Sequence, residues 1–177
     1  MYIWIAIDVN EQVHELREFA ECYVNNHGLT SSTLTLPFHI SLKISFQIPN
    51  DKWQDVICDI RDFCKSLKPF KIPVGGLERN GTIIWLTMKE SNDLNYIHNN
   101  LDELLLKKYG IVQHEFDKSF IFHTSILIMN NEKHLNNAYE AINAVVIPNE
   151  LKAGKIIIGS STNGQAGTYC VNEEIML

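Results

Sequence analysis

Arginine is scarce in this sequence, and acidic residues outnumber basic ones. Of the 177 residues only Arg17, Arg61 and Arg79 carry a guanidinium group, and the formal net charge is −6. Proteins that coat long nucleic acids present a basic face that neutralises phosphates, so this charge argues against that class. A small phosphorylated ligand or an RNA end stays compatible with it. Any phosphate site must then depend on histidine, hydroxyl, lysine and backbone donors, because guanidinium forks are so few.

Paired cysteines and long apolar runs are also missing. No C-x-x-C pair or zinc-finger spacing occurs, so we expect four isolated reduced thiols at Cys22, Cys58, Cys64 and Cys170. No apolar run approaches the roughly 20 residues that a membrane-spanning helix requires. Residues 1–8 lack the basic region of a secretion signal and have the pattern of a strand. These absences predict a cytoplasmic protein with no membrane partner.

The composition is that of an ordinary globular chain. It is 45% hydrophobic and 20% charged, and its length fits one domain or two small lobes that share a core. A chain of this size buries most of its apolar surface on folding and needs no disulfide to stabilise it.

One segment alternates strictly between apolar and polar side chains. Over residues 38–46 every second residue is apolar, from Phe38 to Phe46. A period of two is the mark of a half-buried β-strand. His39, Ser41 and Lys43 are therefore expected to share the polar face of this strand. An imidazole, a hydroxyl and an ammonium group side by side would suit a phosphate.

A second segment repeats this pattern. Residues 120–129 again place an aromatic residue before a histidine and an aliphatic residue after a serine. The histidine is His123 and the serine is Ser125. The chain thus carries the same small arrangement twice, each time on an expected strand.

The order of the expected elements also repeats. The pattern predicts strand, helix, strand, helix, strand in the first half and the same order from about residue 82 onward. Two copies of one β-α-β-α-β unit explain this order most economically, with lobes at residues 1–78 and 79–177. If the copies pack about a pseudo-two-fold axis, both histidines face one cleft. The expected strands cover residues 2–8, 38–46, 70–77, 82–89, 119–129, 153–160 and 167–173, and the expected helices cover residues 11–23, 51–66, 92–108 and 132–145.

Two imidazoles across a phosphate suit general acid–base chemistry on a phosphodiester. A neutral imidazole takes a proton from the attacking oxygen while a protonated one gives a proton to the leaving oxygen. The hydroxyls of Ser41 and Ser125 would bind a nonbridging phosphate oxygen, and Lys43 would add a further donor. This chemistry requires no metal or other cofactor. Two histidines without a nearby carboxylate or thiolate also form a poor metal site.

The tetrapeptides at residues 39–42 (HISL) and 123–126 (HTSI) resemble the two H-x-[ST]-aliphatic motifs of the 2H phosphoesterase superfamily. That group contains the 2′-5′ RNA ligase-like proteins and the cyclic nucleotide phosphodiesterases. The closing segment, with Gly167 before Thr168 and Tyr169, is also similar to it. Both motif hydroxyls are serine here, where threonine is commoner.

This resemblance implies a bilobal α+β fold with mainly antiparallel sheets around a central cleft. It implies metal-independent cleavage of 2′,3′-cyclic phosphates or 2′-5′ phosphodiesters of RNA ends or nucleotides, as in RNA processing, with ligation as the reverse direction. By position, His39 and His123 would be the acid–base pair, and Ser41 and Ser125 would bind the phosphate. The expected partner is a small phosphorylated nucleotide or an RNA end and not DNA, and the protein is expected to be a monomer.

A second hypothesis keeps the same cleft without turnover. It is a binding module for a nucleotide or an RNA end, and it rests on the scarcity of arginine and on Leu127, which interrupts the polar face of the second strand. Tyr169 is a candidate for stacking on a base of the substrate, and packing is its alternative role. Trp4 and Trp85, in the opening strands of the two halves, are expected in the core.

Overall fold

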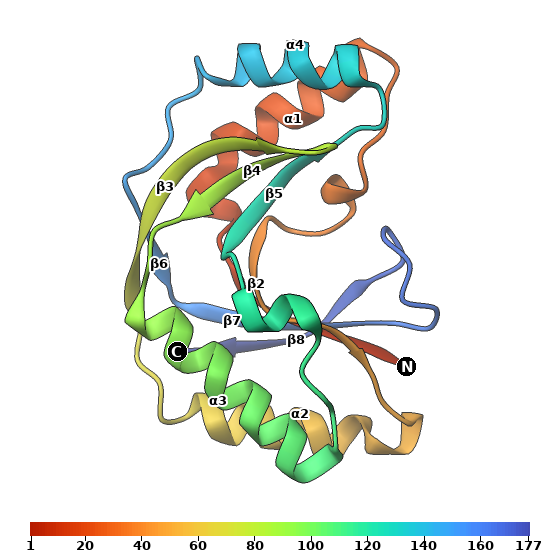
Figure 1. Cartoon of the computed structure of the whole chain (residues 1–177), viewed down its shortest axis with the longest axis vertical. Helices are drawn as coiled ribbons and strands as arrows, with labels where there is room; N and C mark the ends of the chain where they lie inside the picture. Colours follow the sequence, from red (N-terminus) through yellow and green to blue (C-terminus); the bar gives the residue numbers. More distant parts are fainter.

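Two four-stranded antiparallel sheets form the centre of the molecule, and four helices cover them. A computed structural model describes residues 1–177, and Figure 1 shows the sheets between two pairs of helices. The first sheet has the order β2 (His39–Gln47), β1 (Tyr2–Asp8), β7 (Lys155–Ser161) and β8 (Cys170–Met176). The second has the order β5 (His123–Ile128), β4 (Ile83–Met88), β3 (Phe70–Asn80) and β6 (Glu150–Ala153). The expected α+β class with antiparallel sheets is thus confirmed.

The sequence pattern located every helix and most of the strands. The helices are α1 (His14–Asn26), α2 (Trp53–Cys64), α3 (Asn92–Tyr109) and α4 (Glu132–Ile142). The exception is β6, a short strand that the prediction missed, since the expected strand at residues 153–160 includes only its last residue. Gly154 alone separates β6 from β7.

The two sheets do not follow the two halves of the sequence. β3 begins in the first half but pairs with β4 in the second sheet, while β7 and β8 come from the second half and complete the first sheet. The physical reason is a tight turn at Gly81, whose φ of 57° lets β3 and β4 form a hairpin. The expected lobes of residues 1–78 and 79–177 therefore do not coincide with the sheets.

The helices also cross from one sheet to the other. α1 follows β1 in the chain but packs against β5 and α4, and α3 follows β4 but packs against β2. Figure 1 shows the result, with α1 and α4 at one end of the molecule and α2 and α3 at the other. None of the four helices is both long enough and apolar enough to span a bilayer.

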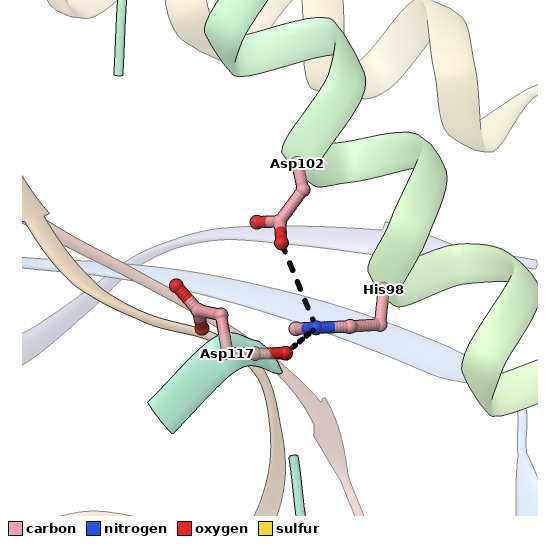
Figure 2. A group of neighbouring side chains, drawn as sticks. All are labelled: His98, Asp102 and Asp117. Carbon is pink, nitrogen blue, oxygen red and sulfur yellow. Dashed lines mark hydrogen bonds and ion pairs between the residues drawn. The ribbon is translucent and has the colours of Figure 1, made fainter. Parts of the chain in front are cut away.

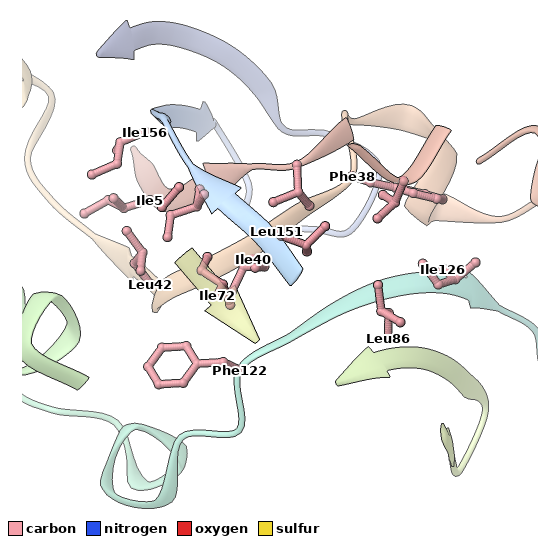
Figure 3. Close-up of a cluster of buried hydrophobic side chains, with 14 of the residues drawn as sticks. Ile5, Phe38, Ile40, Leu42, Ile72, Leu86, Phe122, Ile126, Leu151 and Ile156 are labelled. Carbon is pink, nitrogen blue, oxygen red and sulfur yellow. The ribbon is translucent and has the colours of Figure 1, made fainter. Parts of the chain in front are cut away.

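One hydrophobic core of 37 buried residues joins both sheets to their helices. Figure 3 shows part of it, with Ile40 and Leu42 from β2, Ile72 from β3 and Leu151 from β6. The alternating apolar residues of the strands supply this core, as their period of two predicts. The polar residues between them are left on the other face of each sheet.

The other face of the first sheet carries a small, separate apolar cluster. Trp4, Ala6 and Ile157 form it, apart from the main core. Ala6 lies directly opposite Ser41 in the pairing of β1 with β2, so the cluster and the serine share one face. We call this side of the sheet the histidine face, because His39 also projects there.

Gly159 allows the Trp4 indole to lie against the first sheet. A Cβ atom at this position would stand 2.5 Å from Cε3 of Trp4 and 2.7 Å from the carbonyl oxygen of Cys170. We expect Gly159→Ala to lower the free energy of unfolding by about 1–3 kcal/mol, because the packed indole and strand must shift. Denaturant unfolding measures the loss. Gly154→Ala is the matched control, since its added Cβ meets no atom within 4 Å, and equal midpoints for the two variants would contradict this account.

Candidate active site

His39 is the first residue of β2 and projects onto the histidine face. Its Nδ1 lies 2.7 Å from the carbonyl oxygen of Pro37, two residues earlier, so Nδ1 carries the hydrogen in the neutral ring and donates it. Its Nε2 has no hydrogen-bond partner in the chain. The pKa of His39 is lowered to about 4, chiefly by burial and partly by the nearby His123. The Pro37 carbonyl and Asp8 act in the opposite direction.

His123 repeats this arrangement at the first residue of β5. Its Nδ1 lies 2.7 Å from the carbonyl oxygen of Ile121, again two residues earlier, and its Nε2 is free of protein partners. Burial lowers the pKa of His123, and the hydrogen bond to the Ile121 carbonyl opposes this effect. The two histidines are thus held by the same local hydrogen bond in the two sheets.

The two histidine strands meet, as the sequence predicted. β2 and β5 lie in contact although they belong to different sheets. The charge of His123 helps to lower the pKa of His39. The hydroxyls of Ser41 and Ser125 lie two residues beyond their histidines on the same faces, and neither has a hydrogen-bond partner in the chain. Two Nε2 atoms and two hydroxyls are therefore free to contact a ligand.

This arrangement suits the transfer of protons around an anionic ligand. With Nδ1 committed to a carbonyl, each neutral ring offers a lone pair at Nε2, and each protonated ring offers an N–H there. A pair of such groups can act as base and acid toward one phosphate, while the free hydroxyls donate to its oxygens.

Comparison with known proteins agrees with this geometry. Residues 5–165 match the family model described as the 2′-5′ RNA ligase superfamily. The chain belongs to this superfamily. A search of curated proteins found no match.

Solved structures show the same fold. TT0787 of Thermus thermophilus is 15% identical to the chain, with a TM-score of 0.69 over 100% of this chain and 98% of that one. Escherichia coli LigT complexed with 3′-AMP is 16% identical, with a TM-score of 0.64 over 99% and 97% of the two chains. Usb1 of Kluyveromyces marxianus is 11% identical, with a TM-score of 0.50 over 99% and 98%. At such identities the likeness establishes the fold alone.

One expected phosphate ligand of this superfamily member lies elsewhere. Lys43 is opposite Ile5 in the strand pairing, whereas Ser41 is opposite Ala6, so β2 contains one extra residue between them. This β-bulge turns Lys43 away from the histidine face and into the interior, where it is 2% exposed. The prediction that Lys43 contacts the phosphate is therefore wrong, because strict alternation does not hold across a bulge.

Two aspartates receive the buried ammonium group of Lys43. Its Nζ forms an ion pair with Asp117 and another with Asp102 at 2.9 Å. Figure 2 shows these two carboxylates with His98, whose Nε2 lies 3.1 Å from the Asp117 carbonyl oxygen. Asp117 also accepts a hydrogen bond from the backbone N–H of Ile44, just after the bulge. His98 and the two carboxylates have the chemistry of a metal site, but Lys43 already supplies the positive charge there.

Removal of the Lys43 ammonium group should destabilise this superfamily member strongly. We expect Lys43→Met to lower the free energy of unfolding by about 3–5 kcal/mol, because it leaves buried carboxylates without a cation. Thermal or denaturant unfolding gives the value. Lys65→Met is the control, since the Lys65–Asp62 pair is exposed at the surface, where such pairs contribute about 0–1 kcal/mol. A loss of stability no greater than in the control would show that the buried pair contributes little.

Tyr169 lies on the histidine face, with both its ring and its hydroxyl in contact with the protein. The ring packs against the cluster of Trp4, Ala6 and Ile157, and the hydroxyl lies 2.5 Å from Oγ of Ser45. Tyr169 is half-buried. These contacts correspond to the packing role, the alternative to stacking on a base.

The sequence pattern placed both tryptophans in the core. Trp4 is buried and Trp85 is half-buried, and both lie against the histidines. The rings of Trp4 and His39 are 4.3 Å apart between centroids and inclined by 77°. The rings of Trp85 and His123 are 3.9 Å apart and inclined by 22°, so they are stacked. The available sequence signal was the position of each tryptophan on the strand that opens its half.

Proposed function

We propose that the protein is a metal-independent phosphodiesterase acting on 2′,3′-cyclic phosphates or 2′-5′ phosphodiesters of RNA ends or nucleotides. His39 and His123 act as the general acid–base pair. The observation that carries this proposal is the matched pair of imidazoles on two adjoining strands. Each is fixed through Nδ1 by the carbonyl two residues earlier, and each presents a free Nε2.

Ser41 and Ser125 bind the phosphate in this proposal. Their hydroxyls have no competing partner in the chain, and each lies two residues from a histidine on the same strand face, so both donate to nonbridging oxygens. With Lys43 buried elsewhere, no lysine or arginine of the motif strands contacts the phosphate. The negative charge of the phosphate is stabilised by hydrogen bonds from the hydroxyls and by the imidazole that is protonated.

A small nucleotide or an RNA end is the partner that fits this chemistry. Solved structures of Escherichia coli LigT contain 3′-AMP, ATP and NADP+, which supports a nucleotide ligand for the same fold here. The net charge of −6 disfavours a long polyanion. Action as a monomer in the cytoplasm remains part of the proposal.

The alternative is a binding module that keeps the site without turnover. One of its two arguments weakens in the structure. Leu127 pairs with Ile84 beyond a bulge in β5 and is fully buried, so it does not interrupt the polar face. Ser125 and His123 stay aligned on that face. The scarcity of arginine is the remaining argument for the alternative.

Substitution of either histidine tests the proposal directly. We expect His39→Ala and His123→Ala each to lower kcat by roughly 10²–10⁴-fold, because each removes one proton transfer. Turnover of the four nucleoside 2′,3′-cyclic phosphates and of a 2′-5′-linked dinucleotide, with EDTA present, is followed by chromatography. His14→Ala is the control, since His14 is an exposed histidine on α1. Binding without any wild-type product would support the binding module instead.

The pH optimum should lie on the acidic side of an ordinary histidine. A bell-shaped profile of kcat/KM requires one neutral and one protonated imidazole in the free enzyme, so its maximum lies between the two pKa values. Burial lowers the pKa of both histidines, to about 4 for His39. We therefore expect kcat/KM to be greatest below pH 6.5 and to fall as the acid loses its proton at higher pH. A maximum above pH 7 would contradict this expectation.

A further inference from the structure

The segment that leads into β2 fixes the ring of His39, although it lies outside the sheet. Residues 31–38, here called the connecting segment, contain the 3-10 helix η2 (Ser32–Thr35) and end where β2 begins. Pairing of β2 with β1 starts only at His39, which is opposite Asp8. The carbonyl that holds the Nδ1 of His39 belongs to Pro37, inside the connecting segment. Contacts outside the strand pairing must therefore hold this carbonyl in place.

Arg17, on α1, supplies most of these contacts. Its Nη1 lies 2.8 Å from the carbonyl oxygen of Leu36 and 3.1 Å from Oδ1 of Asn10. Its Nη2 lies 3.1 Å from the carbonyl oxygen of Leu34. The same Oδ1 of Asn10 accepts a hydrogen bond from the backbone N–H of Phe38. One planar guanidinium group and one amide thus bind three backbone groups of the connecting segment.

The guanidinium group of Arg17 is occupied within the protein. Its Nε lies 2.8 Å from a carboxylate oxygen of Glu21, so all three nitrogens have protein acceptors. The group also lies 5.4 Å from the ring centre of Phe38, which is buried. Arg61 and Arg79, by contrast, pair with acidic side chains at the surface. Arg17 therefore has a role inside the fold and is poorly suited to bind a phosphate.

The connecting segment is also bound to the second sheet. Both α1 and η2 pack against β5. Thr33 donates its hydroxyl hydrogen to the carbonyl oxygen of Ile126 at 2.9 Å, and Oγ of Ser31 accepts from the N–H of Ile128 at 3.0 Å. Since β5 begins with the second histidine, the connecting segment joins the backbone of one histidine strand to the start of the other.

We propose that Arg17 is a positioning residue, which holds the connecting segment so that the Pro37 carbonyl fixes the His39 ring with its Nε2 toward the phosphate. This role rests on the two-histidine function proposed above. Arg17 itself touches no reacting atom and transfers no proton. It acts through Pro37, whose carbonyl stays in line with Nδ1 only while the residues on both sides of it are held.

The consequence for His39 is the choice of tautomer. A neutral imidazole carries its hydrogen on either nitrogen, and the hydrogen bond made by one nitrogen decides the state of the other. The bond to Pro37 selects the tautomer with a hydrogen at Nδ1 and a lone pair at Nε2. A ring released from Pro37 would populate both tautomers and more than one orientation, so its Nε2 would less often meet a phosphate correctly.

NMR of the histidine rings tests this role without any turnover. At pH 7 the His39 ring is neutral, since its pKa is lowered to about 4, and its ¹⁵N shifts should report a hydrogen at Nδ1. In Arg17→Met we expect a mixture of the two tautomers. Arg17→Lys keeps the charge without the planar fork and should give a smaller change, and it supplies the test if Arg17→Met does not fold.

Arg61→Met is the matched control for the NMR experiment, because it removes an exposed guanidinium group from α2. It should leave the tautomer of His39 unchanged. The ring of His123, whose partner carbonyl is that of Ile121, should keep its wild-type signals in every variant. A His39 ring that retains its hydrogen fully at Nδ1 in the folded Arg17 variants would overturn the proposal.

Kinetics separate this positioning role from a purely structural one. We expect Arg17→Met to lower kcat on 2′,3′-cyclic phosphates by roughly 10- to 100-fold with little change in KM, because a displaced catalytic group affects reaction more than binding. Equal kcat values for Arg17→Met and Arg61→Met would count against the role of Arg17. Absence of turnover in the wild type would overturn the proposed phosphodiesterase function, and the NMR result would still decide whether Arg17 orients His39.

Discussion

Antiparallel pairing with a central strand is the constraint on which this structure depends. β1 sets the side on which His39 and Ser41 project, and β4 does the same for His123 and Ser125. A shift of one residue in either pairing would turn the imidazole into the core. The apolar residues between the polar ones resist that shift, because it would also move them out of the core. The packing of the core residues therefore also fixes the alignment of the site residues, once on β2 and once on β5.

The histidines and serines could be predicted from the sequence because their signal is local. A period of two indicates which residues of a strand share a face. The repeat of the pattern indicates that the two histidine strands have equivalent roles. Lys43 could not be predicted in this way. Its orientation depends on a bulge that only the partner strand defines, and on Asp117, 74 residues further along the chain. The sequence near a residue does not show which distant residues become its partners in the fold.

The surroundings of the two tryptophans also could not be predicted from the sequence. An apolar ring on a strand is usually a core residue, and Trp4 is indeed buried. What the pattern cannot show is that its cluster lies on the histidine face, or that Trp85 stacks on His123. The order of the elements was predicted well, but the partners of each strand were not, because the hairpin of β3 and β4 links the two halves.

The crossing of the helices means that neither half of the chain covers its own strands without a helix of the other half. α1 covers the sheet that contains β4, and α3 covers the sheet that contains β1. The chain must then fold and unfold as one cooperative unit, since separation of the halves would expose both sheets to water. An isolated half would lack both a covering helix and some of the strands of its sheet, so two such halves could bury their apolar faces only by exchanging these elements.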